Sequence, residues 1–406
     1  MQISILLAQI VVVLLATHLL GFLFARFGQP RVVGEMTAGI LLGPSLLGAL
    51  APAFSAYLFP PQSLGYLNTL SQVGLIFFMF LIGAELNLGE LRRRGRTAVF
   101  VSNAGIAVPF VLGTALALWL YRNLSHPGVP RLHFILFFGT AMSVTAFPVL
   151  ARILTESNLL GTRVGTVAIA SAAVDDVFAW VLLAGVVLLV RSPEGGVTPG
   201  LTLGGTAAFA LFMLFVVRPL LARLRLVERD SSILRRGRLA LLLVLAFASA
   251  WVTERLGLHA VFGAFLMGCV LPRDRRLARG LAESLDGAIV VLLPLFFAQT
   301  GLRTSVALLQ GIPAWLLCLL IILVAVAGKF GGVTLAARLT GMPWREAGAL
   351  GILMNTRGLM ELVILNVGLE VGVITPTVFS MMVLMALVTT FMTTPILKML
   401  SPGLRG

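Results

Sequence analysis

The chain has 406 residues, of which 59% are hydrophobic and only 11% are charged, with a formal net charge of +14. Soluble globular domains carry about a quarter charged residues, so this composition excludes an ordinary water-soluble domain. The positive charge lies in short loops between apolar segments, so we expect membrane lipid rather than nucleic acid as the partner.

Thirteen apolar segments approach or exceed the roughly 20 residues that an α-helix needs to cross a bilayer. We expect all of them to be helical, because only helices and closed barrels satisfy backbone polar groups in lipid. The predicted fold class is therefore an all-α polytopic membrane protein. In chain order the segments are 3–24, 31–50, 65–86, 97–121, 132–154, 163–190, 199–217, 237–254, 257–271, 284–301, 313–337, 345–369 and 374–397.

The loops alternate in charge. Of the 30 Lys and Arg residues, 23 lie in one set of alternate loops and five in the other. The positive-inside rule places the richer set in the cytoplasm. We therefore expect a cell inner membrane protein with its N-terminus outside, its C-terminus cytoplasmic, and residues 401–406 as a short tail.

Three ionisable residues lie deep within predicted spans: Asp175 and Asp176 in 163–190, and Lys329 in 313–337. A charged side chain at the bilayer centre costs about 2.5–3.5 kcal/mol on insertion scales, so such residues are usually functional. One lysine can neutralise one aspartate, which leaves the second carboxylate to bind a proton or a cation in turn. A paired aspartate and lysine with a second, unpaired carboxylate are the minimum set of groups for cation/proton exchange. The alternative is a permanent polar bridge between two helices.

Span 345–369 holds a second charged pair, Arg357 and Glu361, at the i,i+4 spacing that lets two side chains on a helix meet. This pair either stabilises the interior or takes part directly in the ion path.

Two spans contain interruptions. Pro148 in 132–154 lacks a backbone donor and leaves a carbonyl free one turn earlier, beside the hydroxyl of Thr145. Asn355 begins a polar interruption, 355–358, in span 345–369. Transporters use such discontinuous helices near the membrane midplane to bind ions.

The interrupted spans are the fifth and the twelfth of the series. If the chain consists of a six-helix unit, a linker helix at 199–217 and a second six-helix unit, the fifth and twelfth spans occupy equivalent positions in the two units. Because six is even and one linker helix follows, the second unit enters the membrane in the opposite orientation to the first. The sequence thus predicts two inverted six-helix repeats with discontinuous crossing helices, the sodium/proton antiporter fold.

Several motifs resemble the monovalent cation:proton antiporter-2 family of the sodium/proton exchanger superfamily, and especially its plant-type cation/proton exchanger branch. They are Val33–Ser45, Ser143–Leu154, Leu295–Leu302 and Asn355–Val363. The resemblance implies a homodimer in which a mobile core moves against a dimerisation domain, and no regulatory domain is expected. Within a single exchanger domain at 1–400, we assign 97–190 and 313–397 to the core, and 3–86 and 237–301 to the dimerisation part.

The resemblance also implies residue roles. Asp176 would carry the ion, Lys329 would pair with Asp175, and Thr145 would lie beside the ion. We therefore assign Asp176, Asp175 and Thr145 to the binding site of the monovalent cation. Plant-type relatives usually have Asn before the ion-carrying Asp, and potassium-efflux relatives Gln. Asp175 in that position is instead typical of electrogenic sodium/proton antiporters.

The sequence therefore predicts a Na⁺ or K⁺ (or Li⁺)/proton antiporter that works by alternating access around Asp176, electrogenic and without a cofactor. The alternative is an electroneutral K⁺/H⁺ antiporter. An intramembrane aspartyl protease is a remote alternative, because adjacent aspartates point about 100° apart on one helix. A channel is disfavoured because channel filters are usually built by symmetric subunits. We expect no enzymatic activity.

Overall fold

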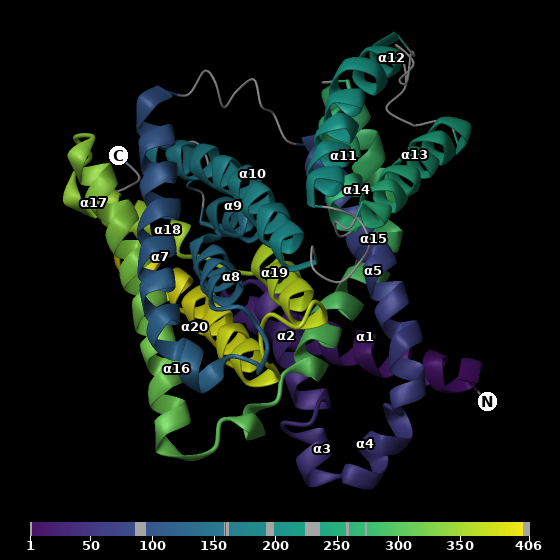
Figure 1. The fold of residues 1–406 in the computed structure, drawn as a ribbon, viewed down its shortest axis with the longest axis vertical. Coiled ribbons are helices and arrows are strands. Elements are labelled where there is room, and N and C mark those ends of the chain that lie inside the picture. The colour runs from purple at the N-terminus through teal and green to yellow at the C-terminus, as the bar shows by residue number, and fades with distance from the viewer. Residues whose placement is uncertain are drawn as a thin grey trace. The chain divides into compact units, whose positions relative to one another are not determined.

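The computed structural model describes residues 2–85, 95–157, 159, 162–191, 199–223, 236–256, 260–272 and 274–400. All regular elements among these residues are helices, and none is a strand (Figure 1). The all-helical prediction is therefore confirmed for this part of the chain. The predicted tail, 401–406, lies outside the described residues.

Nine helical segments in the described ranges are long and apolar enough to cross a membrane. They are Ile3–Arg26, Arg31–Leu50, Pro61–Ala84, Ala98–Leu124, Gly204–Arg223, Gly237–Arg255, Arg276–Leu308, Gly311–Leu339 and Pro376–Leu400. The other four predicted spans are helical as well. Two of them are each divided into two helices, one forms α10 and one forms the short α14.

The first of two units comprises the described residues within Met1–Ile10, Pro61–Leu88 and Val187–Phe296. Besides the start of α1 and the end of α10, it contains α5 (Pro61–Glu85), α11 (Pro199–Phe212), a π-helical turn (Met213–Val217), α12 (Arg218–Arg223), α13 (Arg236–Arg255), α14 (Ala260–Cys269) and most of α15 (Arg275–Arg303).

Glycine lets the helices of the first unit approach closely. A Cβ on Gly83 of α5 would overlap the carbonyl oxygen of Phe265, and a Cβ on Gly268 of α14 would overlap that of Phe80. Small residues at a helix–helix contact are typical of membrane bundles, where packing and not water exclusion drives association.

The second unit comprises the described residues within Val11–Pro60, Gly89–Val186 and Phe297–Gly406. Its helices are most of α1 (Gln2–Arg26), α2 (Arg31–Leu42), α3 (Leu47–Leu50), α4 (Pro52–Leu58), α7 (Gly95–Leu124), α8 (Arg131–Ser143), α9 (Phe147–Glu156), α10 (Arg163–Arg191), the end of α15, a 3₁₀ turn (Val306–Leu308), α16 (Gly311–Val326), a π-helical turn (Ala327–Gly331), α17 (Gly332–Leu339), α18 (Trp344–Met354), α19 (Leu359–Glu370) and α20 (Pro376–Leu400).

Both predicted interruptions are present in the second unit. Residues 144–146 separate α8 from α9, and residues 355–358 separate α18 from α19. The two breaks meet, because the backbone N–H of Ala146 donates to the carbonyl oxygen of Thr356 at 3.0 Å. Four half-helices therefore converge on one point of this unit, where α8, α9, α18 and α19 lie together in Figure 1.

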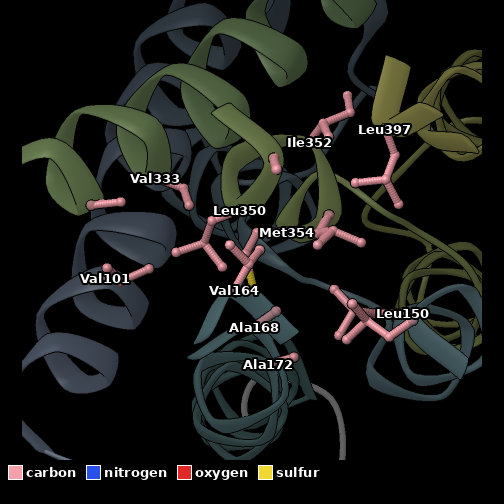
Figure 2. Close-up of a cluster of buried hydrophobic side chains, with 14 of the residues drawn as sticks. Val101, Leu150, Val164, Ala168, Ala172, Val333, Leu350, Ile352, Met354 and Leu397 are labelled. Atoms are coloured by element: carbon pink, nitrogen blue, oxygen red, sulfur yellow. The ribbon is translucent and has the colours of Figure 1, made fainter. Parts of the chain in front are cut away.

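An apolar cluster packs beside this crossing, with side chains from six helices pointing toward one another (Figure 2). Three of its members stand next to polar positions: Ala172 comes three residues before Asp175, Val333 four residues after Lys329, and Met354 directly before the second break. The cluster thus bounds the polar crossing with close-packed apolar side chains. Its labelled members are Val101, Leu150, Val164, Ala168, Ala172, Val333, Leu350, Ile352, Met354 and Leu397.

Three features were not predicted from the sequence. The predicted second span, 31–50, is divided into α2 and the short α3, and the short helix α4 occupies part of the segment taken as the connection to the third span. The turn Ala327–Gly331 is π-helical where a continuous α-helix was expected. The two units also divide residues 3–86 between them, and the assignment of a mobile and a dimerising part stays a prediction.

Candidate ion-binding site

The site is built around Asp175, whose side chain is fully buried on α10. Its Oδ2 accepts hydrogen bonds from Lys329 Nζ at 2.7 Å and from Thr145 Oγ1 at 2.8 Å. Its Oδ1 accepts one from Ser102 Oγ at 2.6 Å. The carboxylate is therefore held by one ammonium group and two hydroxyl groups, contributed by a π-turn, the first break and α7.

Lys329 is fully buried and lies in the π-helical turn between α16 and α17. Its Nζ donates to Asp175 Oδ2, to the carbonyl oxygen of Ser143 at 2.6 Å and to that of Gly105 at 2.7 Å. These three acceptors match the three N–H groups of an ammonium. A buried charge is tolerated only when it is paired and hydrogen-bonded in this way. The π-turn fits this role, because such turns occur frequently at functional sites in helices.

The breaks expose carbonyl groups, and donors from other elements meet them. The guanidinium group of Arg357 donates to the carbonyl oxygens of Ala141 at 3.1 Å and Met142 at 2.7 Å, in the last turn of α8. Thr145 Oγ1 lies 3.1 Å from the carbonyl oxygen of Met354, the last residue of α18. Helix C-termini carry unsatisfied carbonyls and a partial negative charge. Arg357 therefore caps the end of α8, and the hydroxyl of Thr145, whose proton is directed at Asp175, lies against the end of α18.

Arg357 and Glu361 form an ion pair at 3.3 Å, and both side chains are buried. The hydroxyl of Thr390 on α20 accepts from the backbone N–H of Arg357 at 3.0 Å and donates to its carbonyl oxygen at 2.6 Å. Asn355 is buried, and its Nδ2 lies 3.9 Å from the sulfur of Met392. The structure thus places these residues around the second break, where they hold the crossing together.

Of the residues singled out from the sequence, the structure brings together Asp175, Thr145 and Lys329. The backbone of Asp176 belongs to α10 and that of Pro148 to α9, but both side chains lie outside the described part of the structure. The role of Asp176 as ion carrier therefore stays a prediction.

Sequence reasoning missed Ser102, Gly105 and the carbonyl of Ser143, which all contact the charged pair. Ser102 and Gly105 are three residues apart and so share one face of α7. The signal that could have pointed to Gly105 is Pro109, four residues further along the same helix, because a proline lacks the N–H that would bind the Gly105 carbonyl.

The chemistry of the site suits a hard cation. Its ligand atoms are carboxylate, hydroxyl and carbonyl oxygens, which favour hard cations over soft metals. In this arrangement two donors already occupy Asp175 Oδ2, the ammonium of Lys329 and the hydroxyl of Thr145. Two broken helices that cross at a buried charge pair define a secondary transporter.

Comparison with known proteins assigns the family. Residues 10–400 match the model of the sodium/hydrogen exchanger transmembrane family. The chain belongs to this family, and the resemblance predicted from its motifs is confirmed. It is accordingly a multi-pass membrane protein.

Among similar proteins, the chain is 43% identical to the Na⁺/H⁺ antiporter NhaS4 of Synechocystis over 98% of this chain and 97% of that protein. It is 42% identical to cation/H⁺ antiporter 17 of Arabidopsis thaliana, and 35% identical to K⁺/H⁺ antiporter 1 of Saccharomyces cerevisiae. The chain spans about half of these two relatives, 48% and 46% of their lengths.

The structure resembles that of the sodium/proton antiporter MjNhaP1 from Methanocaldococcus jannaschii, with a TM-score of 0.69 over 100% of both chains at 17% identity. At this low identity the likeness shows the fold alone. The predicted antiporter fold is therefore confirmed.

Proposed function

We propose that this protein exchanges a monovalent cation, Na⁺ or K⁺, for protons across a membrane by alternating access. The observation that carries the proposal is the buried Asp175–Lys329 pair at the point where two broken helices cross. Relatives named as Na⁺/H⁺, cation/H⁺ and K⁺/H⁺ antiporters support the same class of substrates.

In the proposed mechanism the cation competes with Lys329 for Asp175. Oδ2 of Asp175 holds the ammonium at 2.7 Å, so a cation that binds this oxygen takes the place of Lys329. An uncompensated buried ion costs several kcal/mol, so binding of the cation is accompanied by release of protons, from Lys329 and from the neighbouring carboxylate of Asp176. The site is neutral with both protons bound, and it carries one net negative charge when both protons have left and one monovalent cation is bound.

With two proton-releasing groups and one monovalent cation, the cycle moves net charge. Two protons exchange for one cation, and the membrane potential drives the reaction. This stoichiometry corresponds to the electrogenic exchange that the two adjacent aspartates predict.

A second candidate is electroneutral K⁺/H⁺ exchange. It is favoured by the extensive bonding of the pair among the described residues, where three donors contact Asp175 and three acceptors contact Lys329. A pair bonded in this way also fits a permanent bridge, and Asp176 alone would then exchange one proton for one cation.

We place the protein in a cell inner membrane as a homodimer, with its N-terminus outside and its C-terminus in the cytoplasm. The orientation is supported by the 23 cations in one set of loops against five in the other. Residues 97–190 and 313–397, which contain the crossing, form the proposed mobile core, with 199–217 as the linker helix.

The test uses purified protein in liposomes with an imposed pH gradient, and Na⁺, K⁺ and Li⁺ are added separately. At least one cation should dissipate the gradient, and failure of all three to do so would overturn the proposal. A matched variant, Asp175→Asn with Lys329→Gln, removes both charges of the pair and leaves the net charge unchanged.

Charge movement is measured with a potassium–valinomycin potential and Na⁺ as the test cation. The cation/proton balance point of the wild type should change with voltage, and Asp175→Asn should reduce this dependence. A balance point that is the same at every voltage would instead support the electroneutral candidate.

A further inference from the structure

We propose that Pro109 is a positioning residue for Lys329, because it leaves the carbonyl oxygen of Gly105 free to bind the ammonium. This inference rests on the proposed function, since it concerns how firmly the site holds the group that the cation must displace.

The first step is the backbone of α7. In an α-helix the N–H of each residue donates to the carbonyl four residues earlier. Pro109 lies inside α7, and a proline has no N–H. The carbonyl that loses its helical donor is therefore that of Gly105, and its oxygen accepts from Lys329 Nζ at 2.7 Å.

The second step concerns the other carbonyl that binds Lys329. In an unbroken helix, the carbonyl of Ser143 would accept from the N–H of residue 147, but α8 ends at Ser143 and α9 begins at Phe147. Both carbonyls on the ammonium are thus made available by defects in two different helices, a proline in one and a break in the other.

The third step is the space around Pro109. A Cβ on Gly105 would lie 2.9 Å from Val333 Cγ2, 3.8 Å from Lys329 Nζ and 4.0 Å from Asp175 Oδ2, so this glycine lies directly against the charged pair. A Cβ on Gly328 would lie 2.9 Å from Pro109 Cα, so Pro109 packs on the residue that precedes Lys329. The proline therefore lies where α7 meets the π-turn.

These contacts predict the effect of restoring the N–H. In Pro109→Ala the new N–H donates to Gly105 and competes with Lys329 for the same oxygen. The ammonium is then held less firmly at Asp175, and a cation displaces it more readily. Because hydrogen bonds to charged groups contribute up to a few kcal/mol and this one is only weakened, we expect the half-saturating cation concentration to fall by about three- to tenfold. The maximal rate should stay within about twofold.

The experiment compares three variants in liposomes: Pro109→Ala, Pro109→Gly and Pro395→Ala. The first two restore the same N–H with different side chains, and the third removes a proline inside α20 whose side chain is exposed. Both Pro109 variants should lower the half-saturating concentration, and Pro395→Ala should not change it. A change in only one of the Pro109 variants would assign the effect to packing and overturn the proposal.

A binding measurement separates this inference from the proposed function. The increase in melting temperature that a cation produces in detergent reports binding without transport, because a ligand that binds only the folded state stabilises it. The Pro109 variants should reach half of the maximal increase at a lower cation concentration than the wild type. An unchanged concentration in both variants would overturn the inference even if exchange is intact. Absence of exchange in the wild type would overturn the proposed function alone.

Discussion

Replacement of Arg357 by methionine tests how the crossing is held together. The guanidinium group is fully buried, donates to the carbonyls of Ala141 and Met142 at 3.1 and 2.7 Å, and lies 3.3 Å from Glu361 Oε2. Methionine retains the unbranched stem as far as the position of Nε and most of the volume of the side chain. Arg357→Met therefore removes the charge and the donors without leaving a large cavity.

The magnitude follows from these contacts. A hydrogen bond to a charged group contributes about 1.5–3 kcal/mol, so loss of both carbonyl contacts costs about 3 kcal/mol or more. Breaking a buried ion pair by removing one partner costs about 3–5 kcal/mol, because the other charge stays buried without compensation. These contributions overlap, and we expect a total of about 5 kcal/mol.

The double variant, Arg357→Met with Glu361→Gln, separates the two roles. It removes the orphaned carboxylate but still leaves the α8 carbonyls without donors. We therefore expect the double variant to be more stable than Arg357→Met by about 2 kcal/mol, yet less stable than the wild type by about 3 kcal/mol.

The assay is thermal unfolding in detergent of the wild type, both single variants and the double variant. Arg357→Met should have the lowest melting temperature of the four. If it unfolds at the wild-type temperature, Arg357 does not cap α8 as the structure indicates. If the double variant is no more stable than Arg357→Met, the ion pair with Glu361 does not contribute.

Two further predictions concern the ion path. Asp176→Asn should abolish coupled exchange while the melting temperature stays that of the wild type, and wild-type proton flux in this variant would contradict its role as ion carrier. Thr145→Val removes a hydroxyl 2.8 Å from Asp175 Oδ2 that we expect to bind the cation directly, so the variant loses one ion contact. It should raise the half-saturating cation concentration about threefold or more, with a smaller effect on the maximal rate. A half-saturating concentration equal to that of the wild type would show that Thr145 only packs at the crossing.

The sequence was sufficient to predict the spans and both breaks. Long apolar segments identify membrane helices directly, since lipid leaves few alternatives for the backbone. The breaks could be predicted because their causes are local: Pro148 lacks a donor, and 355–358 interrupts an apolar segment with polar residues. The meeting of the two breaks at Ala146 and Thr356 depends on tertiary packing, which the local pattern did not contain.

The site was predicted only in part, for a related reason. Charged residues within spans are rare and conspicuous, so Asp175 and Lys329 were found easily. Ser102 and Gly105 are common residues in membrane helices, and their importance depends on contacts with elements 73 and 224 residues away. The π-turn at Lys329 was missed because the change from i→i+4 to i→i+5 backbone hydrogen bonds has no residue pattern of its own.

Two buried ion pairs among the described residues of the second unit differ in what they can do. Arg357 and Glu361 are four residues apart in one short segment that ends in the first turn of α19, so movement of one helix against another does not draw their backbones apart. Arginine also keeps its proton in proteins. Lys329 and Asp175 are 154 residues apart on different helices, and lysine can lose its proton when it is buried. A modest relative movement of α10 and the π-turn therefore breaks the second pair but not the first. The Asp175–Lys329 pair is thus the one suited to exchange, whereas the Arg357–Glu361 pair is suited to keep the crossing rigid while exchange occurs.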